Sequence, residues 1–197
     1  MKLAIAIIGA YVIGSIDFAL VVARMRGIDI REVGSGNPGT SNVLRTMGKG
    51  PAALVLLGDT LKGVMGAFLG TIASESIDPT VHWVFLSGLA AVVGHCYPVF
   101  HRLKGGRGVA TGLGVLLYSL PWLGLGVLGG WLILLKLTKV AAVSSLIVTL
   151  VSLPVAWFLG VRDLGFLWLC LMVALIIFRH RSNIMRMVRG SEQKVPT

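Results

Sequence analysis

The chain has 197 residues, of which 55% are hydrophobic and 13% are charged. An ordinary soluble domain carries about 25% charged residues, so this composition cannot coat a water-facing surface and excludes a soluble globule. The apolar content also excludes intrinsic disorder, and the 26 glycines follow no three-residue period, which excludes a collagen-like fold. We therefore expect one integral membrane domain over residues 1–197.

The charges are strongly unbalanced, with 18 basic against 8 acidic residues and a formal net charge of +10. The basic residues lie in short segments between apolar runs, which is the distribution that the positive-inside rule produces. We therefore expect no nucleic-acid partner, whereas membrane lipid and phosphorylated substrates are expected partners. Cys96 and Cys170 lie in apolar runs without CxxC or Cys/His ligand spacing, which indicates neither a disulfide framework nor a zinc site.

Six apolar runs are near the roughly 20 residues that a helix needs to cross a bilayer. The first run, from Leu3 to Ala23, has no Ala-x-Ala cleavage site before the first polar stretch, so we interpret it as a retained span rather than a signal peptide. The other runs are Pro51 to Ala73, Trp83 to Phe100, Val109 to Leu135, Val140 to Phe158 and Leu164 to Phe178.

The fourth run decides the topology, because it is long and carries Pro121 in its middle. As one helix it would place the basic tail and the basic first loop on opposite sides of the membrane. As two short helices broken near Pro121 it brings all the basic segments to one side, and leaves Glu75, Asp78, Asp163 and Arg162 on the other. We therefore predict an all-α membrane fold of about seven transmembrane helices, some short or broken, with the N-terminus outside and the C-terminus in the cytoplasm.

The first polar island in this apolar chain covers residues 34–42. Its Gly34-x-Gly36-x-x-Gly39 spacing matches the dinucleotide fingerprint, but no βαβ pattern surrounds it, so no nucleotide site is predicted. Glycines and small hydroxyl residues still let backbone N–H groups converge on an anion. Two interpretations stay open here, an anion site and a flexible cytoplasmic turn.

The second island covers residues 94–112. Lys104 and Arg107 flank the pair Gly105–Gly106, and an apolar helix begins directly after Gly108. This order is typical of a phosphate nest capped by a helix N-terminus, although the lysine precedes the glycines and the segment is not a Walker loop. We favour a bound phosphate over the alternative, an interfacial turn whose cations meet lipid phosphates.

The third island covers residues 179–192, directly after the last apolar run. His180 and Asn183 lie at i,i+3 and share one helix face. A basic helix beside a membrane usually anchors to anionic lipid, which remains an alternative here. Lipid attraction needs neither a histidine nor an asparagine, so this pair points to a site.

Four charged or titratable residues within the apolar runs need separate interpretations. Asp59 and Lys62, at i,i+3, are expected to form a structural ion pair. Asp17 has no evident local partner. His95 is as easily a packing residue as a site residue.

The three islands all lie on the predicted cytoplasmic face, and they are rich in cations and amide donors but poor in carboxylates. Such a set suits the binding of phosphate groups and the stabilisation of an oxyanion, rather than metal-dependent chemistry. We therefore expect neither a metal nor a cofactor. The His-x4-Asp pattern of soluble-type phospholipid acyltransferases does not occur.

Three segments resemble, in order and spacing, the motifs of bacterial membrane glycerol-3-phosphate acyltransferases that use acyl-phosphate: GSGNPGTSNVLRTMGKG, GHCYPVFHRLKGGRGVATGLG and RHRSNIMRMVRGSE. The resemblance implies a seven-helix protein of the bacterial inner membrane with its active site facing the cytoplasm. It implies transfer of a fatty acyl group from acyl-phosphate to the 1-hydroxyl of glycerol 3-phosphate. The products would be lysophosphatidate and phosphate, in the first acylation step of phospholipid synthesis.

The resemblance also implies a set of site residues. Catalytic roles would fall on Ser35, Lys104, His180 and Asn183. Substrate-binding roles would fall on Gly34, Gly36, Asn37, Ser41, Asn42, Arg45, Gly105, Gly106, Arg107 and Gly108. In this interpretation Ser35 and residues 104–108 hold the phosphate of acyl-phosphate, while Arg45, Lys104, His180 and Asn183 orient glycerol 3-phosphate.

This chain departs from the family pattern at Ala142, where family members often carry a serine. Ser144 or Ser145 could supply that hydroxyl if the helix is rotated. The alternative function is a small membrane transporter or lipid-binding scaffold for phosphorylated solutes. The sequence predicts no oligomeric state.

Overall fold

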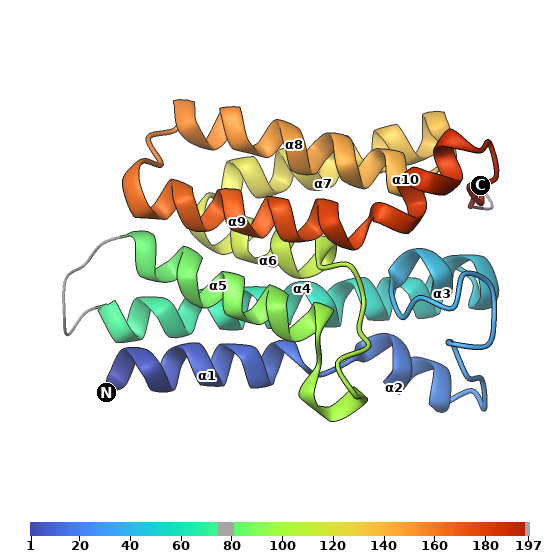
Figure 1. The fold of residues 1–197 in the computed structure, drawn as a ribbon, viewed down its shortest axis with the longest axis horizontal. Coiled ribbons are helices and arrows are strands. Elements are labelled where there is room, and N and C mark those ends of the chain that lie inside the picture. The colour runs from blue at the N-terminus through green and yellow to red at the C-terminus, as the bar shows by residue number, and fades with distance from the viewer. Residues whose placement is uncertain (75–80, 196–197) are drawn as a thin grey trace.

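The computed structural model describes residues 1–74 and 81–195, and within these ranges the chain forms helices and connecting loops without a β-strand (Figure 1). The expected all-α class is thereby confirmed. Glu75 and Asp78, which the charge argument placed opposite the basic segments, lie outside the described residues. The helices are α1 (Lys2–Gly14), α2 (Phe18–Arg24), α3 (Thr40–Met47), α4 (Lys49–Ser74), α5 (Val81–Cys96), the 3₁₀ turn η1 (Val99–His101), α6 (Val109–Ser119), α7 (Pro121–Thr138), α8 (Ala141–Phe158), α9 (Asp163–Arg179) and α10 (Arg181–Val188).

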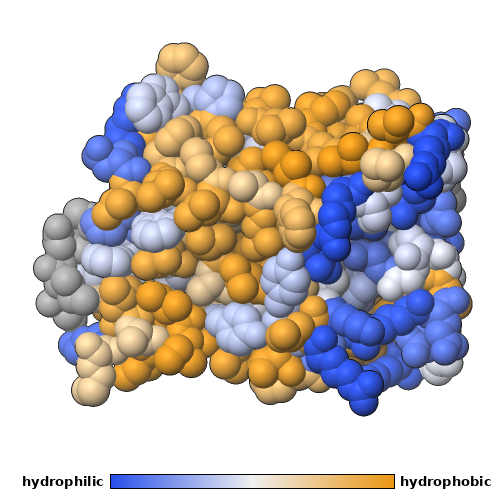
Figure 2. Space-filling view, in the orientation of Figure 1, coloured by the Kyte–Doolittle hydropathy of each residue, from blue (hydrophilic) through white to orange (hydrophobic). Residues whose placement is uncertain are grey.

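The long helices run side by side, with the N-terminus and the C-terminus at opposite ends of the bundle (Figure 1). The polar connections before α3, after α5 and after α9 all lie toward the end that carries the C-terminus. Figure 2 shows the same division on the surface, with apolar residues over the middle of the bundle and hydrophilic residues concentrated at this end. The three polar islands therefore share one end of the molecule, as the sequence predicts.

Five stretches of helix are long and apolar enough to cross a bilayer among the described residues: 2–24, 49–74, 82–101, 121–138 and 141–158. A sixth consists of α9 and α10, which are bent by 51° relative to each other. The predicted break in the fourth apolar run is confirmed, because α6 ends at Ser119 and α7 begins at Pro121, where a proline fits the first helical turn. The two helices are unequal, since α6 has 11 residues and α7 has 18.

The short helix α6 packs tightly between its neighbours, and glycine makes the close approach possible. A side chain at Gly124 of α7 would lie 2.7 Å from the backbone of Leu117 in α6. Gly63 of α4 and Gly114 of α6 each face a backbone carbonyl of the opposite helix that leaves no room for a side chain. α6 begins with half-buried Val109, directly after the buried Gly108.

The first span is interrupted between α1 and α2, and buried charges satisfy the backbone groups at the break. An oxygen of Asp17 accepts a hydrogen bond from the backbone N–H of Leu20 at 3.1 Å and caps α2. Lys62 donates to the carbonyl of Ile16 at 2.7 Å and pairs with Asp59 at 2.7 Å. The expected ion pair is confirmed, and Asp17 has the backbone partner that the sequence did not reveal.

The Lys62→Met substitution should destabilise the protein strongly, because it leaves the buried Asp59 carboxylate without its counter-charge and the Ile16 carbonyl without a donor. Breaking a buried ion pair from one side costs about 3 to 5 kcal/mol. We expect a clear fall in the thermal unfolding midpoint of the purified protein in detergent. The exposed Lys49→Met is the matched control, and Asp59→Asn combined with Lys62→Met should recover part of the loss. An unchanged midpoint in Lys62→Met would show that the pair contributes nothing.

Candidate active site

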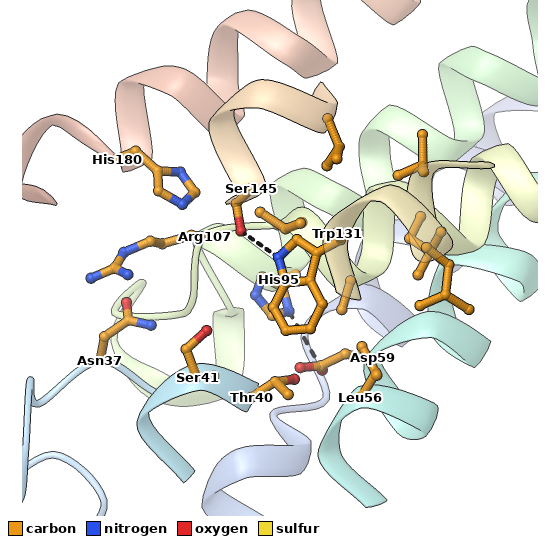
Figure 3. Close-up of a pocket in the computed structure, with 18 residues that line it drawn as sticks. Asn37, Thr40, Ser41, Leu56, Asp59, His95, Arg107, Trp131, Ser145 and His180 are labelled. Atoms are coloured by element: carbon orange, nitrogen blue, oxygen red, sulfur yellow. Dashed lines mark hydrogen bonds and ion pairs between the residues drawn. The ribbon is translucent and has the colours of Figure 1, made fainter. Parts of the chain in front are cut away.

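One pocket joins all three islands at the polar end of the bundle (Figure 3). Its cavity volume is about 80 Å³. Five of the predicted site residues line it, namely Asn37, Ser41, Arg107, Gly108 and His180. Its opposite wall is apolar and is formed by Leu113, Val127, Leu128 and Val148. The pocket thus offers a polar end and an apolar end to one occupant.

Asn42 shapes the loop of the first island rather than the pocket. Its side chain is 1% exposed. Its Oδ1 accepts the N–H of Ser35 at 2.8 Å, and its Nδ2 donates to the carbonyls of Ile30 and Val33 at 3.1 and 3.0 Å. The amide that the sequence assigned to substrate is therefore committed to the backbone, and Asn42 positions the loop that carries Asn37 to the pocket.

Gly34, Gly36 and Ser35 form the turn that Asn42 holds. Both glycines have positive φ, 60° and 66°, and a side chain at Gly34 would collide with the Asn42 amide. The hydroxyl oxygen of Ser35 is buried and has no hydrogen-bond partner among the described residues. None of these three residues lines the pocket, so an involvement of Ser35 in catalysis stays a prediction.

The diglycine of the second island is held from both sides. The N–H groups of Gly105 and Gly106 donate to the carbonyls of Cys96 and His95 at 3.2 and 3.1 Å. Their own carbonyls accept from Arg179 of α9, at 2.7 Å for Gly105 and 3.0 Å for Gly106. This arrangement corrects the expected nest, because the two glycine N–H groups are used within the protein and do not face an anion.

The donors that remain for an anion belong to the beginning of α6. Gly108 adopts the left-handed conformation with φ of 88°, and α6 starts without a side-chain cap. The first N–H groups of a helix have no partner within it, and Gly108, Val109 and Ala110 line the pocket. The helix N-terminus also carries a partial positive charge. An anion in the pocket would meet these groups and Arg107 together.

Arg107 and Lys104 occupy different environments. Arg107 lines the pocket, where burial lowers the pKa of its guanidinium to about 10, so it remains a cation at neutral pH. Lys104 is exposed and does not line the pocket, and its carbonyl accepts a hydrogen bond from Arg31 at 2.9 Å. The cation that lines the pocket is therefore Arg107. The sequence instead favoured Lys104, as the residue that contacts the phosphates of both substrates.

His180 is 2% exposed and lies on the far side of the pocket from the first island (Figure 3). Its Nδ1 lies 2.8 Å from the carbonyl oxygen of Ile176. A carbonyl only accepts, so Nδ1 carries the hydrogen. In the neutral ring Nε2 is then an acceptor, which suits a hydroxyl group of a substrate.

Asn183 and Arg45 are engaged by the C-terminal tail and do not line the pocket. Asn183 donates to Glu192 at 2.7 Å, and Arg186 donates to the other oxygen of the same carboxylate at 2.7 Å. Arg45 donates to the carbonyls of residues 193 and 194 at 3.0 and 3.2 Å, and burial lowers the pKa of its guanidinium. The described part of the tail reaches buried Val195, whose N–H donates to the carbonyl of Lys139 at 2.8 Å.

Several pocket residues were missed or left open by the sequence analysis. Asp59 and His95 line the pocket, with 3.5 Å between the carboxylate and the Nδ1 atom of the ring. Ser145 also lines it and accepts a hydrogen bond from the indole of Trp131 at 3.0 Å (Figure 3). Ser145 thus brings a hydroxyl to the pocket about one helical turn beyond Ala142, whereas Ser144 bonds to the carbonyl of Val140 at 3.2 Å.

The fold and the pocket define a multi-pass membrane protein whose pocket carries a cation, backbone donors and apolar side chains. The chain belongs to the glycerol-3-phosphate acyltransferase family, because the family model of that description matches residues 4–190. The resemblance seen in the three motifs is thereby confirmed. A glycerol-3-phosphate acyltransferase of Thioalkalivibrio sulfidiphilus is 41% identical over 96% of this chain and 92% of that relative, and one of Rubrobacter xylanophilus is 42% identical over 93% and 90%.

Two crystal structures share the fold over the whole chain. Both are described as PlsY (YgiH), an integral membrane glycerol 3-phosphate acyltransferase, one in the glycerol 3-phosphate form and one in the lysophosphatidic acid form. Each is 36% identical to this chain, which covers 97% of the solved chain, and the TM-scores are 0.91 and 0.89.

The Arg179→Met substitution should reduce the acylation activity, because two charge-assisted hydrogen bonds to the diglycine are lost. Each such bond contributes about 1.5 to 3 kcal/mol, so kcat/KM should fall by at least about tenfold. Arg179→Lys should restore little, since a lysine lacks the planar fork that contacts both carbonyls. Steady-state kinetics with Arg181→Met as the control, an exposed arginine beside Phe178, would check this. Equal activity of the Arg179 and Arg181 variants would contradict it.

Proposed function

We propose that this protein transfers a fatty acyl group from acyl-phosphate to the 1-hydroxyl of glycerol 3-phosphate, giving lysophosphatidate and inorganic phosphate. The observation that carries the proposal is the two-sided pocket. Arg107 and the uncapped start of α6 meet at one end, and apolar side chains form the other. An acyl-phosphate has the same two parts, a phosphate and a hydrocarbon chain. Family membership supports glycerol 3-phosphate as the acceptor.

The phosphate of the donor would bind at the start of α6, where Arg107 and the backbone N–H groups of Gly108 and Val109 converge. The acyl chain would then extend along Leu113 and Val127 into the apolar part of the pocket. Glycerol 3-phosphate would enter from the polar end of the bundle, past Asn37 and Ser41. Nε2 of His180 would accept a hydrogen bond from its hydroxyl and turn the oxygen toward the acyl carbon.

The reaction needs no catalytic dyad, because acyl-phosphate is an activated mixed anhydride. The hydroxyl oxygen forms a bond to the acyl carbon, and the bond between that carbon and the phosphate oxygen breaks. The phosphate leaves with the electron pair, and the hydroxyl proton ends on a phosphate oxygen, whose second pKa near 6 suits it as an acceptor. Arg107 and the N–H groups of α6 stabilise the negative charge that develops.

The donor assignment is tested by incubating the purified protein with palmitoyl-phosphate and glycerol 3-phosphate. We expect lysophosphatidate and inorganic phosphate in equal amounts. Palmitoyl-CoA should support a rate at least about tenfold lower, because it lacks the acyl-linked phosphate that Arg107 and α6 would bind. Arg107→Ala is the matched variant, with Arg189→Ala at an exposed position as its control. Equal rates with the two donors would overturn the donor assignment.

We further propose that the protein lies in the bacterial plasma membrane with the pocket facing the cytoplasm. The end of the bundle that carries the pocket holds the basic connections and the basic tail, and cytoplasmic loops carry such an excess. The relatives named above are bacterial proteins.

The orientation is tested with single cysteines on a background in which Cys96 and Cys170 are replaced. Cysteines at the exposed positions Lys104 and Arg189 should react with a membrane-impermeant maleimide only after the cytoplasmic face is opened. A cysteine at Arg162, in the connection between α8 and α9, should react in intact cells without an outer membrane barrier. Reaction of positions 104 and 189 from opposite sides would contradict the shared face, and reaction of both from outside would invert the orientation.

A further inference from the structure

An apolar groove separate from the site pocket runs between α7 and α8. Its volume is about 520 Å³, and Ser152 is the one hydroxyl residue among the side chains that line it. Along α7 it extends from Trp122 to Leu134, which is about 18 Å at 1.5 Å per residue. The other wall runs from Ile147 of α8 to Leu159, the residue directly after this helix. The groove therefore covers more than half of the roughly 30 Å hydrocarbon core of a bilayer.

The groove adjoins the apolar end of the site pocket. Val127 of α7 and Val148 of α8 line both spaces. A smaller apolar space shares Val127 and Ser152 with the groove, and Val109 and Leu113 with the pocket. A chain that starts at the polar end of the pocket thus reaches the groove at the level of Val127 and Val148.

Two glycines leave the groove open. Gly126 and Gly130 line it, and a side chain at Gly126 would meet nothing within 4 Å. A side chain at Gly130 would touch Val148 alone, at an ordinary 3.5 Å. These glycines differ from Gly124, which is packed against α6. Larger residues at positions 126 and 130 would fill the groove without disturbing the helices.

We propose that the groove between α7 and α8 holds the distal part of the donor's acyl chain, and that Gly126 and Gly130 determine which chain lengths the enzyme accepts. The proposal rests on the proposed acyl-phosphate reaction. The first carbons would lie in the site pocket, and the carbons beyond Val127 would lie in the groove. Short chains would end near the level of Val127, whereas long chains would continue past Gly126 toward Trp122.

A second apolar space, between α4 and α7, is the competing place for the chain. Its volume is about 450 Å³, and it shares Trp131 and Leu56 with the site pocket. Lys49 and Lys136 stand at its edge. Their charges mark the polar end of the bundle, so a chain there would leave the hydrocarbon region. The groove between α7 and α8 has no charged residue in its lining, and we assign the chain to it.

The test compares octanoyl-phosphate and palmitoyl-phosphate as donors for the unsubstituted protein and four variants. Gly126→Leu fills the groove. Gly129→Leu is the matched control, because this glycine lies in the same helix, has open space around it and does not line the groove. Ala53→Leu fills the competing space. The readouts are kcat/KM for each donor and KM for glycerol 3-phosphate, with thermal unfolding as the check that each variant folds.

We expect Gly126→Leu to lower kcat/KM for palmitoyl-phosphate relative to octanoyl-phosphate by at least about tenfold, since apolar pockets discriminate chain length at this scale. Its KM for glycerol 3-phosphate and its rate with octanoyl-phosphate should match those of the unsubstituted protein. Gly129→Leu should leave the donor ratio unchanged. Gly130→Leu should lower the ratio as well, and it replaces Gly126→Leu if that variant fails to fold.

Three results would overturn the proposal. The first is an equal loss of kcat/KM with both donors in Gly126→Leu. The second is the same change of the donor ratio in Gly129→Leu. The third is a change of the donor ratio in Ala53→Leu with none in Gly126→Leu. In each of these cases the unsubstituted protein still uses acyl-phosphate, so the proposed reaction stands. An unsubstituted protein that acylates glycerol 3-phosphate with neither donor would overturn the proposed reaction and the groove assignment with it.

Discussion

The bonds that hold the diglycine before α6 are the constraint on which the site depends. Gly105, Gly106 and Gly108 are buried at the start of α6, where an unsatisfied backbone group is costly. The carbonyls of His95 and Cys96 take the two N–H groups, and Arg179 takes the two carbonyls. With the glycines satisfied in this way, the start of α6 keeps its own free donors for the pocket.

The break in the first span, between α1 and α2, is a second place where side chains satisfy buried backbone groups. Its break exposes backbone groups near the middle of the bundle, and Asp17 and Lys62 satisfy them. Lys62 in turn balances Asp59, which borders the pocket beside His95. The buried charges therefore connect the broken helix to the wall of the site. In both places a long cationic side chain from a neighbouring helix, Lys62 or Arg179, donates to backbone carbonyls in an interrupted segment.

The sequence predicted the features that depend on local composition. The break at Pro121, the ion pair at i,i+3 and the gathering of three polar islands at one end follow from spacing and charge alone. The partners of Asn42, Arg179 and Glu192 could not be predicted, because each pairs with backbone or side chains through the tertiary fold. For the same reason the sequence favoured Lys104 over Arg107, since both flank the same glycines and only burial in the fold separates them.

The C-terminal tail takes part in the architecture of the polar end. Its backbone carbonyls hold Arg45, the Glu192 carboxylate holds Asn183 and Arg186, and Val195 hydrogen-bonds to the carbonyl of Lys139 in the turn between α7 and α8. The tail therefore links three separate elements, α3, α10 and the turn between α7 and α8, at the polar end of the bundle. An affinity tag or fluorescent fusion at the C-terminus would disturb these tail contacts. One at the N-terminus, at the opposite end of the bundle, would not.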